Sequence, residues 1–159
     1  MKVNAWKAVK GHNGPEMVHD HIPAVNIDGR QRGDSPDRIY EVCKALEMDR
    51  ETEEHLYIFC MDNKLKITAF FQASVGNANS SIMDPRVIMR NALMLNASFI
   101  AMAHNHPSGD ATPSPADITG TRRIKEAGDL LNVPLVDHIV VGNGYFISIR
   151  NDAETRIWQ

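Results

Sequence analysis

The chain has 159 residues, 43% of them hydrophobic, which suits one domain with a core and leaves little room for two. It carries 17 Lys and Arg against 20 Asp and Glu, a net charge of -3. A nucleic-acid-binding protein usually has a strong positive balance or a dense basic face. The composition therefore argues against DNA as the main direct ligand.

The two cysteines, Cys43 and Cys60, lie in apolar segments and form no CxxC pair. We predict that both are buried free thiols of a reducing compartment. No segment approaches the roughly 18 apolar residues that span a bilayer, and the N-terminus lacks the apolar run of a signal peptide. The sequence thus predicts a cytoplasmic protein without membrane contact. It leaves open whether the protein forms a homo-oligomer.

The first third of the chain contains one irregular and one regular segment. Residues 1–33 show short apolar alternations, ending with Val25 and Ile27 and broken by Gly and Pro, which predict one or two strands with loops. Residues 34–48 predict a helix, because Ser35 suits the N-cap, a proline follows it, and apolar residues then recur at helical spacing.

The rest of the chain alternates predicted strands and helices. Helix starts carry Asp or Ser before a proline, and hairpin turns are rich in Asp, Asn or Gly. In chain order the elements are a hairpin over 55–71 with its turn at 62–64, a helix over 84–97, a buried strand over 98–103, a helix from Ser114 to about Leu131, and a hairpin over 133–149 with its turn at 142–144. This order predicts an α/β or α+β fold, a mixed β-sheet flanked by helices.

Residues 103–117, AHNHPSGDATPSPAD, follow the predicted buried strand. His104 and His106 are two residues apart, so an extended backbone turns both imidazoles to the same side. Asp117 falls in the first turn of the next helix, and the loop 107–113 can bring it back to them. A catalytic zinc ion typically has three such protein ligands and a water molecule.

The same residues also have simpler interpretations. Ser114 and Asp117 make a good helix start, with serine at the cap and an acid three residues later. Asp110, in the loop, is another conceivable third ligand. A second His-x-His pair at 19–21 has no Ser-x-x-Asp at a matching distance, and we interpret it as exposed strand or loop.

The complete spacing, which is His-x-His, seven residues, Ser, two residues and Asp, resembles the JAMM motif of the MPN-plus metalloproteases. HNHPSGDATPSPAD is similar to its bacterial RadC form, and the segments EHLYIFCMDNK, MDPRVIMRNALMLNAS and VPLVDHIVVGNGYFISI resemble the elements around it. The resemblance covers about residues 35–150. It implies a JAMM/MPN domain of cytidine-deaminase-like architecture over 35–159. Residues 1–34 become an N-terminal extension of the same domain, too short for the helix-hairpin-helix region usual in RadC proteins.

The resemblance also implies roles for individual residues. It makes His104, His106 and Asp117 the ligands of one zinc ion, and it gives Ser114 the task of holding or polarising the oxyanion. The glutamate that the family carries on an upstream strand corresponds best to Glu54.

Several neighbouring residues receive weaker assignments. Glu53 stays an alternative to Glu54, since a strand turns only one of two adjacent side chains inward. His138 matches the family's Asp-His pair, and we interpret it as structural or as a partner of a ligand. Asn105 is expected to fit the turn between the two ligands. The remaining histidines are predicted to be solvated: His12, His19, His21 and His55.

The implied reaction is hydrolysis of an amide bond in a peptide or protein, by a zinc-dependent metallopeptidase or isopeptidase of the JAMM class. Glu54 would move a proton from water to the leaving amine, zinc would act as a Lewis acid, and Ser114 would stabilise the oxyanion. The alternative is a DNA-repair-associated or protein-binding module that keeps the metal site for structure. A zinc nucleoside deaminase is excluded, because its motif needs a CxxC that this sequence lacks.

Overall fold

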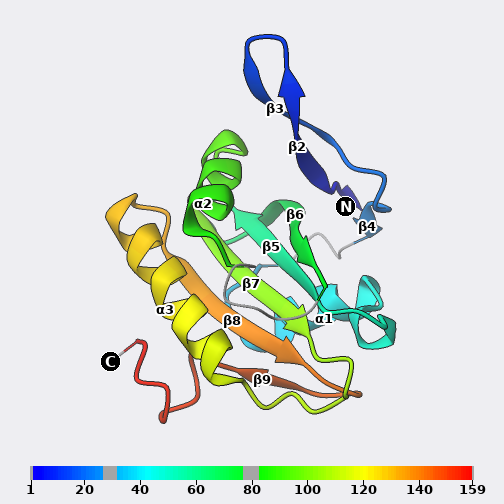
Figure 1. Cartoon of the computed structure of the whole chain (residues 1–159), viewed down its shortest axis with the longest axis vertical. Helices are drawn as coiled ribbons and strands as arrows, with labels where there is room; N and C mark the ends of the chain where they lie inside the picture. The colour runs from blue at the N-terminus through cyan, green and yellow to red at the C-terminus, as the bar shows by residue number, and fades with distance from the viewer. Residues whose placement is uncertain (1, 27–31, 77–82, 159) are drawn as a thin grey trace.

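The computed structural model describes residues 2–26, 32–76 and 83–158, and its centre is a five-stranded sheet with helices on both faces (Figure 1). The strands of this sheet are β5 (His55–Met61), β6 (Ile67–Val75), β7 (Phe99–Asn105), β8 (Leu135–Val141) and β9 (Phe146–Ser148). They lie in the order β6-β5-β7-β8-β9. β7 and β8 are parallel and the other neighbours are antiparallel. The prediction of a mixed sheet flanked by helices is confirmed.

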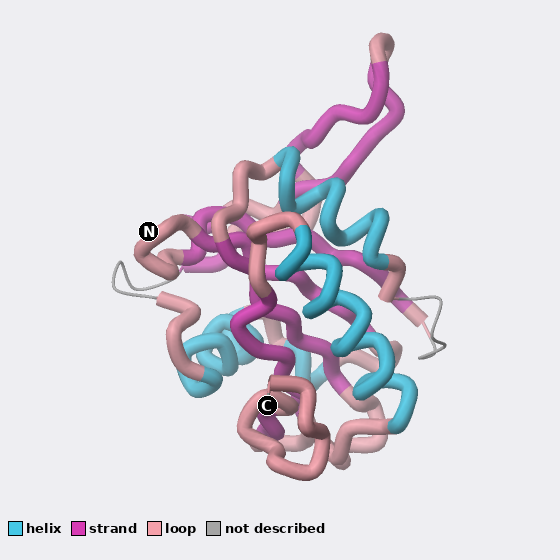
Figure 2. The backbone as a smooth tube through the Cα atoms, turned by 90° about the vertical axis from the view of Figure 1, so that its left-hand side faces the viewer, coloured by secondary structure: helices cyan, strands magenta, loops and turns pink. Residues whose placement is uncertain are grey.

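The helices are α1 (Pro36–Ala45), α2 (Pro85–Met94) and α3 (Pro115–Leu130), with a 3-10 turn η1 (Met48–Arg50) after the first. α2 and α3 lie side by side on one face of the sheet, and α1 covers the other (Figures 1 and 2). Each of these three α-helices begins at a predicted cap, because Ser35, Asp84 and Ser114 each accept a hydrogen bond from a main-chain amide in the first turn.

The sheet is buried on both faces, which explains why β5 is almost continuously apolar. Tyr57 and Phe59 of β5 pack in the cluster that includes the buried side of α1. Leu56 and Ile58 pack in the cluster that includes α2 and α3. Alternate residues of one strand therefore serve two cores, and both clusters fix the register of β5.

The first 33 residues differ from the prediction of one or two strands. The described part of this segment, residues 2–26 and 32–33, contains four short strands: β1 (Lys2–Val3), β2 (Trp6–Gly11), β3 (Gly14–His19) and β4 (Val25–Asn26). β2 and β3 form a hairpin that projects from the rest of the fold (Figures 1 and 2), whereas β1 pairs with β4. The two-residue strands escape prediction because packing on the α1 side of the core, through Val3 and Val25, holds them in place. Ile27 lies outside the described residues.

Two further features are the state of the cysteines and the length and polarity of the helices. Cys43 and Cys60 are both buried and free, as predicted. Burial raises the pKa of each thiol, that of Cys60 to about 12, so neither is a reactive thiolate near neutral pH. Among the described helices, none combines the length and the apolar character needed to cross a bilayer.

Helix α3 contains two glycines that allow a matched test of its packing. A Cβ on Gly128 would lie 2.6 Å from the carbonyl oxygen of Val133, a main-chain atom that cannot easily move aside. A Cβ on Gly120 would instead meet the flexible side chain of Met83. We expect Gly128→Ala to lower the free energy of unfolding by about 1–3 kcal/mol. Gly120→Ala should stay near the parent, since helix propensity offsets the small shift by up to about 1 kcal/mol. Equal stability of the two variants in urea would contradict this packing.

Candidate metal centre

Three segments of the chain bring four side chains together where the C-terminal end of β7 lies beside the N-terminal end of β5. β7 carries His104 and leads directly into His106, α3 carries Asp117 in its first turn, and Glu54 immediately precedes β5. Because β5 is antiparallel to β7, with Leu56 opposite His104, the start of β5 lies beside the end of β7. One nitrogen or oxygen atom from each of the four side chains lies within 4.8 Å of all the others.

β7 is longer than the predicted strand over 98–103. It includes His104 and Asn105, because parallel pairing with β8 continues as far as Val141. The first histidine therefore lies within the strand and not after it. The consequence drawn from an extended backbone still holds, since the Nε2 atoms of His104 and His106 are 3.0 Å apart.

The spacing of the donor atoms fits a small tetrahedral metal ion. His104 Nε2 lies 3.3 Å from Asp117 Oδ1, and His106 Nε2 lies 3.4 Å from Asp117 Oδ2. Metal bonds of about 2.0–2.1 Å at tetrahedral angles place neighbouring ligand atoms about 3.3 Å apart. Glu54 Oε1 is slightly farther from His104 Nε2, at 3.7 Å. The geometry therefore brings together all three predicted ligands, with the predicted glutamate beside them.

Asp117 and His104 are the most buried of these groups, since each is 1% exposed. Burial alone would raise the pKa of Asp117, but hydrogen bonds from His104, His106 and Ser114 outweigh burial and hold that pKa far below its ordinary value. The hydrogen bond to Asp117 is also the main cause that raises the pKa of His106. Asp117 is thus an anion, the form that a metal ion requires.

A buried chain of hydrogen bonds sets the tautomer of His104. The main-chain carbonyl of Asp117 can only accept, so the hydroxyl of Thr121 donates to it at 2.6 Å. That hydroxyl then accepts from His138 Nδ1 at 2.6 Å, which leaves His138 Nε2 to accept from His104 Nδ1 at 2.8 Å. Burial lowers the pKa of His138 well below its ordinary value, which keeps the ring neutral. The ring of His104 therefore turns Nε2 toward Asp117 and the rest of the cluster.

His106 reaches the same state by a shorter route. Its Nδ1 donates to the main-chain carbonyl of Asp110 at 2.7 Å, which turns Nε2 toward Asp117. Tyr145 holds the loop around that carbonyl, because its hydroxyl accepts from the amide of Ala111 at 2.9 Å and donates to the Asp110 carboxylate at 3.3 Å. The Nε2 atoms of both imidazoles then face the Asp117 carboxylate, and a proton on Nε2 supplies the hydrogen bond to it. A metal ion would take the place of these protons, and two imidazoles with a carboxylate form a donor set that binds zinc.

Ser114 forms a capping box with Asp117, as the simpler interpretation predicts. Its Oγ accepts from the amide of Asp117 at 3.1 Å and donates to Asp117 Oδ2 at 2.7 Å. The same Oδ2 accepts from the amide of Ser114 at 2.7 Å. The cap and the ligand assignments are compatible, since the cap turns the carboxylate toward β7.

The alternatives that the sequence left open are separated by position. Glu53 is exposed, whereas the Glu54 side chain is 15% exposed and turned toward His104. The Asp110 carboxylate accepts from Thr112, from the amide at 2.9 Å and from the hydroxyl at 2.7 Å, and lies on the exposed side of the loop. Position thus favours Glu54 over Glu53, and Asp117 over Asp110.

The other histidines confirm one prediction and correct another. His12, His19 and His21 are exposed, as predicted. His55 is not solvated: its side chain is 13% exposed, and its Nδ1 meets the Gln72 amide at 2.5 Å. The prediction failed because the hairpin partner β6 covers His55.

Two supporting residues were not recognised from the sequence. Thr121 lies one helical turn after Asp117, a spacing that could have placed both on one face of α3. Asn105 was expected to fit a turn, but it is 1% exposed and lies at the end of a strand. Its partners belong to β5 and to the segment before it, which no local signal identifies.

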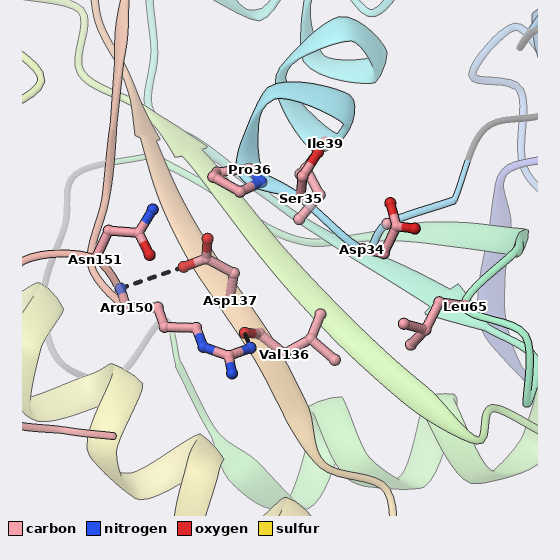
Figure 3. A pocket seen from close by; sticks show the side chains of 10 residues that line it. Asp34, Ser35, Pro36, Ile39, Leu65, Val136, Asp137, Arg150 and Asn151 are labelled. Carbon is pink, nitrogen blue, oxygen red and sulfur yellow. Dashed lines mark hydrogen bonds between the residues drawn. The ribbon is translucent and has the colours of Figure 1, made fainter. Parts of the chain in front are cut away.

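A cavity of about 340 Å³ lies away from this cluster, between the N-terminal end of α1 and β8 (Figure 3). Its buried carboxylate, Asp137, accepts from Ser148 Oγ at 2.7 Å and from the amides of His138 and Arg150. The Arg150 side chain donates to the carbonyl of Val136 at 2.7 Å. These polar groups bond to the chain itself, and their bonds connect β8 to the residues at and after the end of β9.

Comparison with known families matches residues 33–155 to the RadC-like JAB domain. The chain is similar to UPF0758 proteins: that of Roseiflexus castenholzii is 42% identical over 105 residues, covering 66% of this chain and 45% of the relative. Those of Thermotoga maritima and Geotalea uraniireducens are each 39% identical, over 121 and 125 residues that cover 76% and 79% of this chain and 54% of each relative. The chain spans about half the length of these relatives. The matched span contains the whole four-residue cluster, and the chain belongs to the RadC-like JAB domain family.

Proposed function

We propose that the protein is a zinc-dependent hydrolase of amide bonds, a peptidase or isopeptidase of the JAMM class that acts on a peptide or protein. The observation that carries this proposal is the convergence of His104, His106 and Asp117, with Glu54 beside them. The JAB domain is related to the JAMM hydrolases, which gives the same reaction class.

His104, His106 and Asp117 would hold one zinc ion, because two neutral imidazoles and a carboxylate suit it and the atoms have tetrahedral spacing. When bound, zinc polarises a carbonyl group and lowers the pKa of a water molecule to about 7. Three protein ligands leave a fourth position open, which distinguishes a catalytic site from a structural one.

Glu54 is placed to move the protons of the reaction. Its Oε1 lies 3.7 Å from His104 Nε2, outside the close contacts that Asp117 makes with both histidines. A carboxylate at this position accepts a proton from the attacking water and returns it to the leaving amine. Ser114 is the neighbouring hydroxyl, and it would donate to the oxyanion by turning its single proton away from Asp117 Oδ2.

Substitution of Asp117 and of Asp110 should show which of the two carboxylates binds the metal ion. Asp117→Ala should weaken zinc binding by more than the roughly 10–100-fold that loss of a residue supporting a ligand costs. Asp110→Ala should retain zinc, because only its main-chain carbonyl contacts His106. Zinc titration with a competing chelator measures both variants. Retention of zinc by Asp117→Ala, with loss in Asp110→Ala, would reverse the assignment.

The role of Glu54 can be tested without disturbing the metal. Glu54→Gln should keep zinc and lower kcat by about 10²–10⁴-fold, because an amide cannot accept the proton of water. Its exposed neighbour supplies the control, and Glu53→Gln should hydrolyse a peptide-library substrate at nearly the parent rate. Chelator should abolish the parent activity. If Glu54→Gln cleaves as fast as the parent with zinc intact, Glu54 is not the base and Glu53 becomes the residue to test. If the zinc-loaded parent cleaves no substrate, a metal-holding binding module becomes the better description.

Ser114 has a cap role that must be separated from any role in catalysis. Ser114→Ala should lower stability by about 0.5–2 kcal/mol through loss of the cap, and kcat by about 10²–10³-fold if the hydroxyl donates to the oxyanion. Ser35→Ala removes the corresponding cap of α1, away from the site, and should cost only stability. Thermal unfolding and kcat measured on both variants distinguish the roles. Equal, near-parent activity of the two would leave Ser114 with the cap role alone.

A further inference from the structure

Asn105, the middle residue of the His-x-His tripeptide, has a different environment from His104 and His106. Side chains alternate along an extended backbone, so Asn105 turns away from the imidazoles of His104 and His106. It is nevertheless 1% exposed. A buried primary amide has two donors and two lone pairs to satisfy, and its contacts show what it holds.

Both contacts of Asn105 reach the segment that carries Glu54. Its Oδ1 accepts from the main-chain amide of His55 at 2.8 Å, and its Nδ2 donates to the main-chain carbonyl of Glu53 at 2.9 Å. These are the residues directly after and directly before Glu54. Because the partners are an N–H and a C=O, the orientation of the amide is unambiguous.

The position of this side chain has a structural reason. The regular pairing of β5 with β7 ends at Leu56 opposite His104. Beyond this point β7 continues along β8, and the amide of His106 donates to the carbonyl of Val141 at 2.9 Å. The side chain of Asn105 then supplies the next two hydrogen bonds to the β5 side, in place of main-chain pairing.

We propose that Asn105 is a positioning residue for Glu54: it clamps Glu53 and His55 to the end of β7 and so fixes the glutamate relative to the metal ligands. This inference rests on the proposed function for its effect on rate, but the clamp itself does not. The carbonyl of Glu54 also accepts from the amide of Gly76, the residue after β6, at 2.9 Å, so the chain at the end of β6 holds Glu54 from the other side.

The clamp requires an amide at position 105. Asn105→Ala removes both hydrogen bonds. Asn105→Asp keeps the shape and can still accept from His55, but it sets an acceptor against the carbonyl of Glu53 and should not rescue the function. A residue that merely fits a turn would tolerate Asp, which is nearly isosteric.

The kinetic test is a double-mutant cycle with Glu54→Gln. Asn105→Ala should retain zinc and lower kcat about 10–100-fold with little change in KM, since small displacements of a catalytic group have effects of this size. In the Glu54→Gln background it should cause no further loss. Asn91, a buried asparagine of α2, is the matched control, and Asn91→Ala should leave kcat unchanged. Equal losses in both backgrounds, or loss of zinc in Asn105→Ala, would overturn the proposal.

A second measurement is independent of activity. Hydrogen exchange followed by NMR should show the His55 amide exchanging about tenfold faster in Asn105→Ala, which removes its acceptor, while the Ile58 amide in the middle of β5 is unchanged. Unaltered protection of His55 would overturn the clamp even if the protein is a hydrolase. Faster exchange in a protein that hydrolyses no substrate would support the clamp and leave the proposed function to fail alone.

Discussion

The burial of the Asp117 carboxylate is the constraint to which the rest of the site responds. A buried charge costs several kcal/mol unless other groups compensate for it. Ser114 compensates from the same helix, through its amide and its hydroxyl, and the imidazoles of His104 and His106 do so from the end of β7. The start of α3 adds the positive end of a helix dipole. The bonds that begin the helix are therefore the ones that aim its carboxylate at the strand.

The ligands are also tied to one another through the fold. The hydrogen bonds that run from His104 through His138 and Thr121 end on the main-chain carbonyl of Asp117. These hydrogen bonds link β7, β8 and α3. The orientation of the His104 ring therefore depends on α3, the helix that carries Asp117. Donors held in this way need little rearrangement to receive an ion, which is the usual requirement for a metal site of fixed geometry.

Local signals predicted much of this structure, and the failures have one cause. The caps at Ser35, Asp84 and Ser114 could be identified because a cap bonds to residues close to it in the chain. The same holds for the hairpin turns at 62–64 and 142–144, whereas the β2–β3 hairpin was not identified. The His-x-His spacing worked for the same reason, since an extended backbone alone directs both side chains. By contrast, the partners of His138 and Asn105 depend on the register of β7 with β8 and β5. No property of the residues themselves reveals such pairings, and the short N-terminal strands, which form only against the core, were undercounted for that reason.

The alternation of β7 allows three consecutive residues to serve two purposes. His104 and His106 turn to the face that α3 covers, while Asn105 reaches the segment before β5. A slip of one residue in the pairing of β5 with β7 would exchange these faces and move the glutamate away from the ligands. The cores on both sides of β5 oppose that slip, because Tyr57 and Phe59 fit one cluster and Leu56 and Ile58 fit the other. The apolar core thus sets the register that brings Glu54 close to the metal ligands. The hydrogen bonds of Asn105 then fix the final position of the segment that carries Glu54.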